Sequence, residues 1–315
     1  MLQTMKGIGH FMNTDKEQIG THSKLPEGAK FRLGKSSIIG NVAFSADGTR
    51  LAVAGDIGTW IYDIQSGEEV SLLAGHTEYV WSVAYSPDGD TVATGSYEEI
   101  WLWDSSTGLP TATLSEHRDY VRALAYSPDG STLASGGADN IGILWDVASE
   151  EPKATLKGHA GSIRSLAYSP DGSTIATASS DELVILWQAA TGQSKASLKG
   201  HTHVINSVDF SPDGGTIVTG SSDGTVRLWD AFTSKRKTTL VDFKFYVWGV
   251  TYSPDGETIA IGGRDGAVHL VDAETGDVKK VLKGHIGSVR SVAYSPDGSI
   301  IASGSEDHSV LLWQC

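Results

Sequence analysis

The chain has 315 residues and a formal net charge of −14, from 38 acidic and 24 basic residues. The acid excess argues against a general nucleic-acid binder, which would present a basic surface. No apolar run approaches the roughly 18 residues needed to cross a bilayer, and the single cysteine, Cys315, excludes an internal disulfide framework. With 37 glycines and no long segment at helical spacing, we expect an all-β cytoplasmic protein without nucleic-acid or membrane partners.

A five-residue motif, [Phe/Tyr]-Ser-x-Asp-Gly, recurs seven times along the chain. Successive copies are 41, 41, 42, 42, 42 and 42 residues apart. Each copy is followed by two apolar alternations separated by a short polar turn, and the second alternation ends in Trp-Asp or a related pair. Period-2 alternation predicts strands, and Pro-Asp-Gly and Asp-Gly predict turns. Each repeat is therefore predicted to form four short strands. The motif begins at Phe44, Tyr85, Tyr126, Tyr168, Phe210, Tyr252 and Tyr294.

These repeats, with pairs such as Trp145-Asp146 and Gly158-His159, resemble those of the WD40 family. The resemblance implies a closed seven-bladed β-propeller of four-stranded antiparallel blades over residues 28–315. Residues 1–27 are expected to be an N-terminal extension or linker. The last repeat stops after its third strand, so we expect 29–33 to supply its outer strand and to close the propeller.

Repeats one and two are one residue shorter than the others. The glycine of the motif and the Trp position are 14 residues apart there, at Gly48 to Tyr62 and Gly89 to Trp103, instead of 15. The missing residue lies between the second and third predicted strands. We therefore expect a tighter turn in these two repeats.

The resemblance also implies a buried hydrogen-bonded set in each blade. It consists of the His of Gly-His, a Ser or Thr on the second strand, an Asp in the following turn and the Trp. Buried polar groups of this kind must satisfy one another. Repeat two keeps His76, Thr94 and Trp103 but has Tyr97 at the Asp position. Four repeats match in full: the third with His117, Ser135, Asp139 and Trp145, the fourth with His159, Thr177, Asp181 and Trp187, the fifth with His201, Thr219, Asp223 and Trp229, and the seventh with His285, Ser303, Asp307 and Trp313.

Repeats one and six depart from this pattern at several positions together. Where the His and the Trp are replaced, the hydroxyl residue is replaced as well, as expected if a half-satisfied network is worse than none. The Ser, His and Asp residues are interpreted as scaffold rather than as a catalytic set. Nothing else stands out as an acid, base, nucleophile or metal-ligand cluster, so we expect no enzyme activity, cofactor or metal. The replacing residues are Lys35, Val53 and Tyr62 in repeat one and Phe243, Ile261 and Val271 in repeat six.

The most informative residues are those that differ between repeats just before the motif. By the resemblance, this segment enters the innermost strand from the top face, around the mouth of the central channel. Exposed aromatic and Arg side chains are typical of binding hot spots. A second interpretation, in which the tryptophans fill the mouth and the tyrosines cover neighbouring blades, stays open. The candidate binding residues are Tyr79, Trp81, Tyr120, Arg122, Arg164, Asn206, Tyr246, Trp248, Arg264 and Arg290.

The functional hypothesis is a non-enzymatic scaffold, favoured as a monomer, that binds a protein or peptide at this face. Arg122, Arg164 and Arg290 would pair with acidic or phosphorylated side chains, for which the guanidinium fork is suited. One alternative is a small-ligand or carbohydrate-binding propeller that uses the aromatic residues as stacking platforms. Another is a structural module of a larger multidomain protein.

Overall fold

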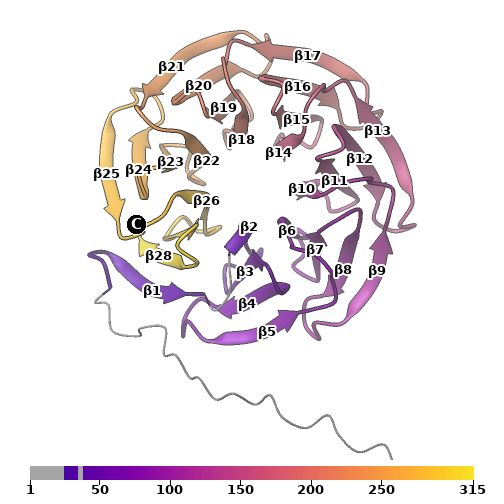
Figure 1. Cartoon of the computed structure of the whole chain (residues 1–315). Coiled ribbons are helices and arrows are strands. Elements are labelled where there is room, and N and C mark those ends of the chain that lie inside the picture. Colours follow the sequence, from indigo (N-terminus) through magenta and orange to yellow (C-terminus); the bar gives the residue numbers. More distant parts are fainter. Residues whose placement is uncertain (1–24, 35–37) are drawn as a thin grey trace, which may run out of the picture.

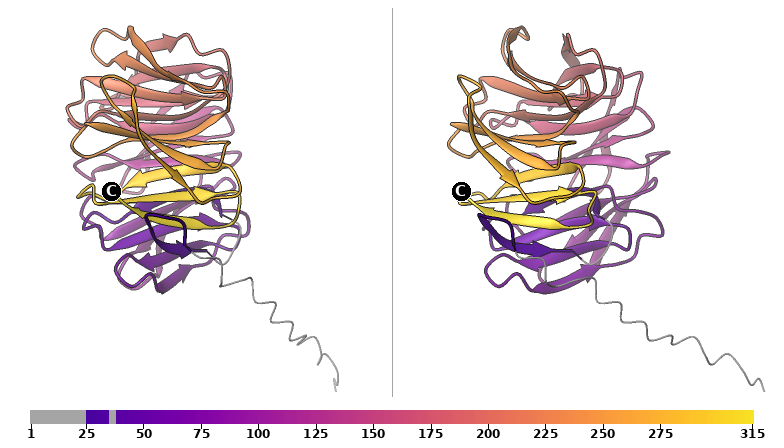
Figure 2. Two further views of the ribbon diagram at one scale, coloured as in Figure 1. Left: turned by 90° about the vertical axis from the view of Figure 1, so that its left-hand side faces the viewer. Right: turned by 60° about the vertical axis from the view of Figure 1, so that its left-hand side comes forward.

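The computed structural model describes residues 25–34 and 38–315, which form seven four-stranded sheets around a central channel (Figure 1). Side views show the blades stacked side by side as a short cylinder (Figure 2). All the regular elements in these two ranges are strands, and none of them is a helix that could cross a membrane. The all-β, seven-bladed prediction is confirmed.

Blades 1 to 6 each take four consecutive strands, from the channel outward. Blades 1 and 2 contain β2 (Ile38–Phe44), β3 (Arg50–Gly55), β4 (Thr59–Asp63), β5 (Glu69–Leu73), β6 (Ser82–Tyr85), β7 (Thr91–Gly95), β8 (Ile100–Asp104) and β9 (Pro110–Leu114). Blades 3 and 4 contain β10 (Val121–Tyr126), β11 (Thr132–Gly137), β12 (Ile141–Asp146), β13 (Pro152–Lys157), β14 (Ile163–Tyr168), β15 (Thr174–Ser179), β16 (Leu183–Gln188) and β17 (Ser194–Lys199). Blades 5 and 6 contain β18 (Ile205–Phe210), β19 (Thr216–Ser221), β20 (Thr225–Asp230), β21 (Arg236–Asp242), β22 (Val247–Tyr252), β23 (Thr258–Gly263), β24 (Ala267–Asp272) and β25 (Val278–Lys283).

Blade 7 joins the two ends of the described chain. It contains β26 (Val289–Tyr294), β27 (Ile300–Ser305), β28 (Val310–Gln314) and, as its outer strand, β1 (Ala29–Leu33). β1 runs antiparallel to β28, beside it in Figure 1, with Ala29 opposite Trp313 and Leu33 opposite Val310. The predicted closure by an N-terminal strand is confirmed. Of the expected N-terminal extension, residues 1–24 lie outside the described residues.

The turns between the second and third strands show where the two short repeats lose their residue. In blade 1 two residues separate Gly55 from Gly58, and the Gly55 N–H donates to the Gly58 carbonyl (3.0 Å). Blade 2 has the same two-residue turn between Ser96 and Glu99. In blade 3, three residues (138–140) separate the strands, and Asn140 takes a left-handed conformation with φ of 69°. The expected one-residue difference is thus a change of turn type.

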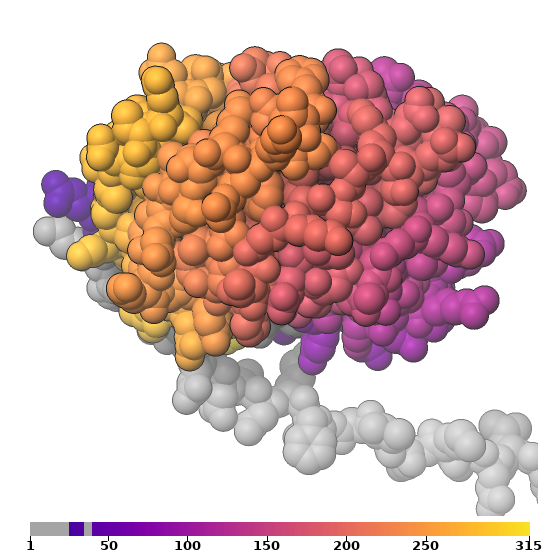
Figure 3. All heavy atoms as spheres, turned by 90° about the horizontal axis from the view of Figure 1, so that it is seen from above, coloured from indigo at the N-terminus to yellow at the C-terminus, as the bar shows by residue number. Residues whose placement is uncertain are grey.

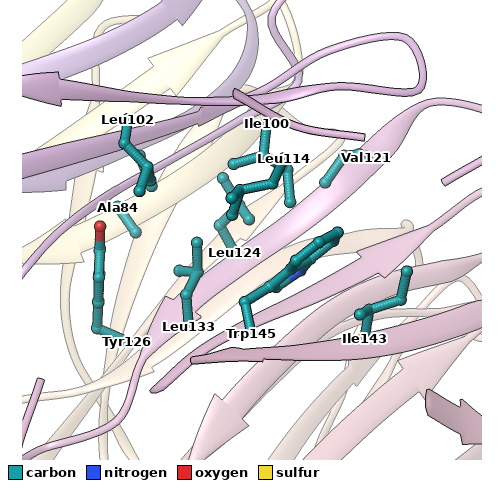
Figure 4. Packing of buried hydrophobic residues seen from close by; sticks show 11 residues of the cluster. Ala84, Ile100, Leu102, Leu114, Val121, Leu124, Tyr126, Leu133, Ile143 and Trp145 are labelled. Carbon is teal, nitrogen blue, oxygen red and sulfur yellow. The ribbon is translucent and has the colours of Figure 1, made fainter. Parts of the chain in front are cut away.

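The hydrophobic core consists of seven clusters, each of which lies between two neighbouring blades. Figure 4 shows the cluster between blades 2 and 3, where Ile100 and Leu114 of blade 2 face Leu124, Leu133 and Trp145 of blade 3. The outer strands form the convex side wall, seen for residues of blades 5 and 6 in Figure 3. Because every cluster belongs to two blades, the hydrophobic effect stabilises the closed set rather than any single blade.

Polar side chains also join the innermost strands of neighbouring blades. Asp209 on β18 is the largest departure from the repeat there, since Ala167 occupies the same position in blade 4. Its Oδ2 accepts hydrogen bonds from the Tyr252 N–H (3.0 Å) and the Thr251 hydroxyl (3.0 Å) of blade 6. Burial raises the pKa of Asp209 to about 6, against the lowering effect of these hydrogen bonds. Blades 5 and 6 are therefore joined through the carboxylate of the half-buried Asp209.

Candidate functional site

One face of the propeller gathers all the candidate binding residues. The segments that enter the innermost strands meet the turns between the second and third strands at the same end of each blade. In blade 3 the Ala138 N–H donates to the Tyr120 carbonyl (2.8 Å), and in blade 6 the Arg264 N–H donates to the Tyr246 carbonyl (3.0 Å). We call this end the top face.

The predicted scaffold sets form continuous hydrogen-bonded chains beneath the top face. In blade 4 the Trp187 indole N–H donates to Thr177 Oγ1 (2.8 Å), which lies 2.8 Å from His159 Nε2. His159 Nδ1 lies 2.8 Å from Asp181 Oδ2, which also accepts from the Ala160 N–H (2.8 Å). These contacts tie the entering segment, the second and third strands and the turn together.

The hydroxyl group is the centre of the chain in the three other complete sets as well. In blade 3, Ser135 Oγ accepts from the Trp145 indole N–H (2.9 Å) and lies 2.8 Å from His117 Nε2. In blade 5, Thr219 Oγ1 accepts from the Trp229 indole N–H (2.9 Å) and lies 2.7 Å from His201 Nε2. In blade 7, Ser303 Oγ accepts from the Trp313 indole N–H (2.8 Å) and lies 2.8 Å from His285 Nε2. The three histidines contact Asp139, Asp223 and Asp307 through Nδ1.

The hydroxyl and indole members of these sets differ from the candidate binding residues in their exposure. Ser135, Thr219 and Ser303 are 0% exposed, and Trp229 is 2% exposed. None of the four lines the central cavity. A partner or ligand at the surface therefore cannot contact Ser135, Thr219, Trp229 or Ser303. These residues stabilise the blades that hold the top face and are not themselves part of a binding site.

Blades 1, 2 and 6 differ from this pattern. In blade 2, Trp103 and His76 both contact Thr94 Oγ1, at 2.7 and 2.8 Å, and Tyr97 occupies the turn. In blade 1, Tyr62 replaces the Trp and is buried, whereas Lys35 lies outside the described residues.

Blade 6 retains a polar pair that the sequence pattern does not predict. Asp265 keeps the turn position, and its Oδ2 lies 2.8 Å from Nε2 of His269 on β24. The Phe245 ring in blade 6 packs against Gly263 as the His117 ring in blade 3 packs against Gly137. A Cβ atom on Gly263 would lie 2.3 Å from the Phe245 ring, and one on Gly137 would lie 2.7 Å from the His117 ring. Phe243, at the aligned His position, stacks on Phe245 with centroids 4.6 Å apart. Repeat six therefore keeps a His–Asp contact although its scaffold His and Trp are replaced, because Asp265 has exchanged one histidine for another.

The channel mouth is lined by six of the candidate binding residues. The central cavity has a volume of about 520 Å³. Gly40 of blade 1 contributes no side chain, since a Cβ there would lie 2.4 Å from the Trp81 carbonyl oxygen. The other six blades contribute Trp81, Arg122, Arg164, Asn206, Trp248 and Arg290 in turn, and all six are half-buried.

Two of the arginines at the mouth stack on the tryptophan of the preceding blade. The Arg122 guanidinium carbon lies 4.4 Å from the Trp81 ring centroid, and that of Arg290 lies 3.7 Å from the Trp248 ring. Such cation–π contacts hold the side chains in place without using their N–H donors. Arg290 Nε also donates to Glu306 Oε1 (2.8 Å). Arg290 is thus already paired, unlike the free group that the sequence suggested.

Arg164 and Asn206 lie between these two stacks. Arg164 Nε donates to Ser180 Oγ (3.0 Å). Burial, with the like charges of Arg122 and Arg290, lowers the pKa of Arg164. The three guanidinium groups therefore repel one another across the cavity. Asn206 Nδ2 donates to Ser222 Oγ (2.9 Å) and to the Val247 carbonyl (2.8 Å), so its amide serves the scaffold.

Around the rim, aromatic side chains extend the two stacks outward. Tyr79 and Tyr246 are 47% and 38% exposed. Tyr120 is half-buried, with its ring centroid 5.9 Å from that of Trp81. Blade 7 has Ser288 at the position of Tyr246, and this serine is buried, so it adds no aromatic surface to the rim.

Two further rim residues were not singled out as binding candidates. Tyr97 is 43% exposed and lies edge-on to Tyr120, with centroids 5.1 Å apart. His203 stacks on Tyr246 (6.0 Å), whose ring also contacts the Arg264 guanidinium (5.2 Å). The signal for Tyr97 was its presence at the Asp position of a shortened turn. The signal for His203 was its place at the start of 203–210, one of the segments that differ between repeats.

Seven of the candidates, with Tyr97 and His203, form two clusters on opposite sides of the mouth, and Tyr79, Arg164 and Asn206 belong to neither. The blade 2–3 cluster contains Trp81, Tyr97, Tyr120 and Arg122. The blade 5–7 cluster contains His203, Tyr246, Trp248, Arg264 and Arg290. In the ranges that the structure describes, no three His, Cys, Asp or Glu side chains are grouped closely enough to hold a metal ion.

Comparison with protein families agrees with the repeat and with the blades. The WD40 family model, described as WD domain, G-beta repeat, matches residues 67–104, 108–146, 150–188, 192–230, 234–272 and 276–314. Most of blade 1 lies outside these matches, and blade 1 is the blade with Val53 and Tyr62 at two of the scaffold positions. No individual curated protein matches the chain. Six matched repeats, which span well over half of the sequence, show that the chain belongs to the WD40 family.

Proposed function

We propose that the chain is a non-enzymatic scaffold that, as a monomer, binds a protein or peptide at its top face. WD40 propellers commonly mediate protein interactions. The observation that supports the top face is the pair of aromatic–Arg clusters on either side of the channel mouth. Tyr, Trp and Arg are the residue types that dominate binding hot spots.

The contacts within each cluster suit it to binding. Stacking on Trp81 and Trp248 restricts Arg122 and Arg290 before any partner arrives, which lowers the entropy cost of association. Tyr79 and Tyr246 offer exposed aromatic surface on the rim, and Tyr246 contacts the Arg264 guanidinium. An extended segment that crosses the mouth would contact both clusters, and its acidic or phosphorylated side chain would reach the arginines.

The same contacts favour a protein partner over a carbohydrate. A sugar-binding platform needs an open aromatic face, but a guanidinium covers one face of Trp81 and of Trp248. Tyr246 contacts both His203 and Arg264. The remaining polar donors are cationic, which suits acidic side chains better than neutral hydroxyl groups.

The test is affinity capture from native lysate, with the double variant Tyr79→Ala plus Tyr246→Ala. Both side chains are exposed, so the melting temperature should stay unchanged. The matched control is Leu109→Ala plus Phe232→Ala, which removes apolar side chains that are 64% and 84% exposed in turns at the opposite end of the blades.

We expect the top-face variant to lose the captured protein and the control variant to keep it. Retention of every partner by the top-face variant would contradict the proposal. Peptide and glycan arrays probed with the same proteins separate a peptide ligand from a sugar, and tyrosine-dependent binding to glycans alone would favour the carbohydrate alternative.

A further inference from the structure

Two of the three arginines at the channel mouth have no acidic partner. Among residues 25–34 and 38–315, neither Arg122 nor Arg164 belongs to an ion pair, whereas Arg290 is paired with Glu306. The charge of Asp119 acts on Arg122 from beyond ion-pair distance, and the Asp119 carboxylate accepts from the Tyr120 N–H (2.7 Å). Asp209 also lines the cavity, but its carboxylate is bonded to Thr251 and Tyr252 of blade 6. Half-buried cations without an ion-pair partner are costly, so the mouth of this cavity favours an anion.

The free hydrogen-bond donors of Arg122 and Arg164 also favour an anion in the cavity. Stacking on Trp81 uses the flat face of the Arg122 guanidinium and leaves its N–H edge free. In the described part of the chain, Arg164 donates only through Nε, to Ser180. The terminal N–H groups of both residues therefore lack protein acceptors in the same cavity. Donors without acceptors suit a ligand that only accepts.

The ion pair of Arg290 and Glu306 is weaker than a buried ion pair. The Arg290 and Glu306 side chains are 37% and 44% exposed, so water and salt screen their attraction. Glu306 nevertheless neutralises the third guanidinium next to the cavity. It occupies the place that an incoming anion would otherwise take on Arg290.

We propose that Arg122 and Arg164 together bind one phosphate-type oxyanion at the channel mouth, and that Glu306 competes with it for Arg290. The anion is either inorganic phosphate or the phosphoryl group of a phosphorylated side chain. At neutral pH a phosphoryl group carries about −1.5 to −2 charges, which matches the two unpaired guanidinium groups better than a single carboxylate does. This inference rests on the part of the proposed function that assigns an acidic group to the arginines.

The experiment is isothermal titration calorimetry of the full chain at low ionic strength, with inorganic phosphate and with acetate as separate probes. Wild type should bind phosphate at least about tenfold more tightly than acetate. Arg122→Gln and Arg164→Gln should each weaken phosphate binding by about tenfold or more, as expected when one charge-assisted contact is lost. Arg236→Gln, an exposed arginine on the outer strand β21 and outside the cavity, is the matched control and should change phosphate binding by less than about twofold.

Glu306→Gln tests the competition. It removes the counter-charge of Arg290 while keeping the side-chain shape, so phosphate affinity should rise by about threefold or more. Unchanged affinity in this variant would overturn the role of Glu306. Absence of phosphate binding by wild type, or unchanged binding in both folded arginine variants, would overturn the anion site itself.

A second arm distinguishes the two sources of phosphate. A glycine-flanked phosphoserine peptide that binds more tightly than inorganic phosphate identifies a side-chain ligand, and equal affinities identify the free ion. The tyrosines that test the proposed function do not line this cavity. If the tyrosine variant loses its partner but wild type does not bind phosphate, only the anion site is refuted. If wild type binds phosphate but the tyrosine variant keeps every partner, only the protein-binding function is refuted.

Discussion

Replacing Thr177 by valine is the sharpest test of the hydrogen-bonded scaffold, because it removes one hydroxyl while almost conserving volume. Thr177 Oγ1 accepts from the Trp187 indole N–H (2.8 Å) and contacts His159 Nε2 (2.8 Å). Thr177 and Trp187 are 0% and 1% exposed, so water cannot replace the lost partner. An unsatisfied buried group costs about 1–3 kcal/mol. Two such groups predict a loss of about 2–6 kcal/mol in the free energy of unfolding.

The assay is a double-mutant cycle with Trp187→Phe, measured by urea denaturation. Phenylalanine has no indole N–H, so Thr177→Val should cost about 1–2 kcal/mol less in that background. Ile261→Val, at the same strand position in blade 6, is the control. It should cost only about 0.5–1.5 kcal/mol, the usual effect of one buried methylene group. Additivity of the two blade 4 substitutions within about 0.5 kcal/mol would refute the reasoning, since it would mean that the hydroxyl and the indole are not coupled.

Three further predictions concern closure, pH and blade 6. Deletion of residues 1–24 should leave the melting temperature unchanged, whereas deletion of 1–34 should lower it by removing β1 from blade 7; equal melting temperatures would contradict the closure argument. The folded pKa of Asp209, about 6, exceeds the ordinary value of 3.8, so its stabilising contribution is complete below pH 3.8 and is lost as pH rises through 6. The free energy of unfolding of Asp209→Asn should therefore rise relative to that of wild type between pH 4 and pH 8, by at most about 3 kcal/mol. If urea denaturation gives the same difference between the two proteins at every pH, the prediction is wrong. His269→Leu should destabilise wild type but have little effect in an Asp265→Ala background, and a full effect in that background would show that the two side chains are uncoupled.

The architecture was predictable from the sequence because seven copies of one pattern constrain one another. The motif placed the turns, and the alternation placed the strands. The absence of a fourth strand after Trp313 led to the correct position of residues 29–33. Even the one-residue shortening at Tyr62 and Trp103 corresponds to a real difference in turn type.

The arrangement within the candidate site was only partly predictable. The repeat placed Arg122 and Arg290 beside the channel, but which aromatic ring each would contact depends on the directions of side chains from neighbouring blades. The pairing of Arg290 with Glu306 joins the same two repeat positions as the Arg164–Ser180 and Asn206–Ser222 contacts, each 16 residues apart, but only in blade 7 do these positions hold opposite charges. The exchange of His partners by Asp265 could not be predicted, because His269 occupies a position that holds unrelated residues in other blades.

The pairing of β1 with β28 also determines how the molecule responds to tension. The strands are antiparallel, and the start of β1, at Ala29, lies opposite Trp313 near the end of β28. A force applied through the chain at these two points would pull on one end of the ladder, so its hydrogen bonds would break one after another instead of sharing the load. β1 would then separate from β28 before the other six blades are strained. A tether attached to both ends of the chain would make this propeller a weak mechanical link, although the same pairing closes it at rest.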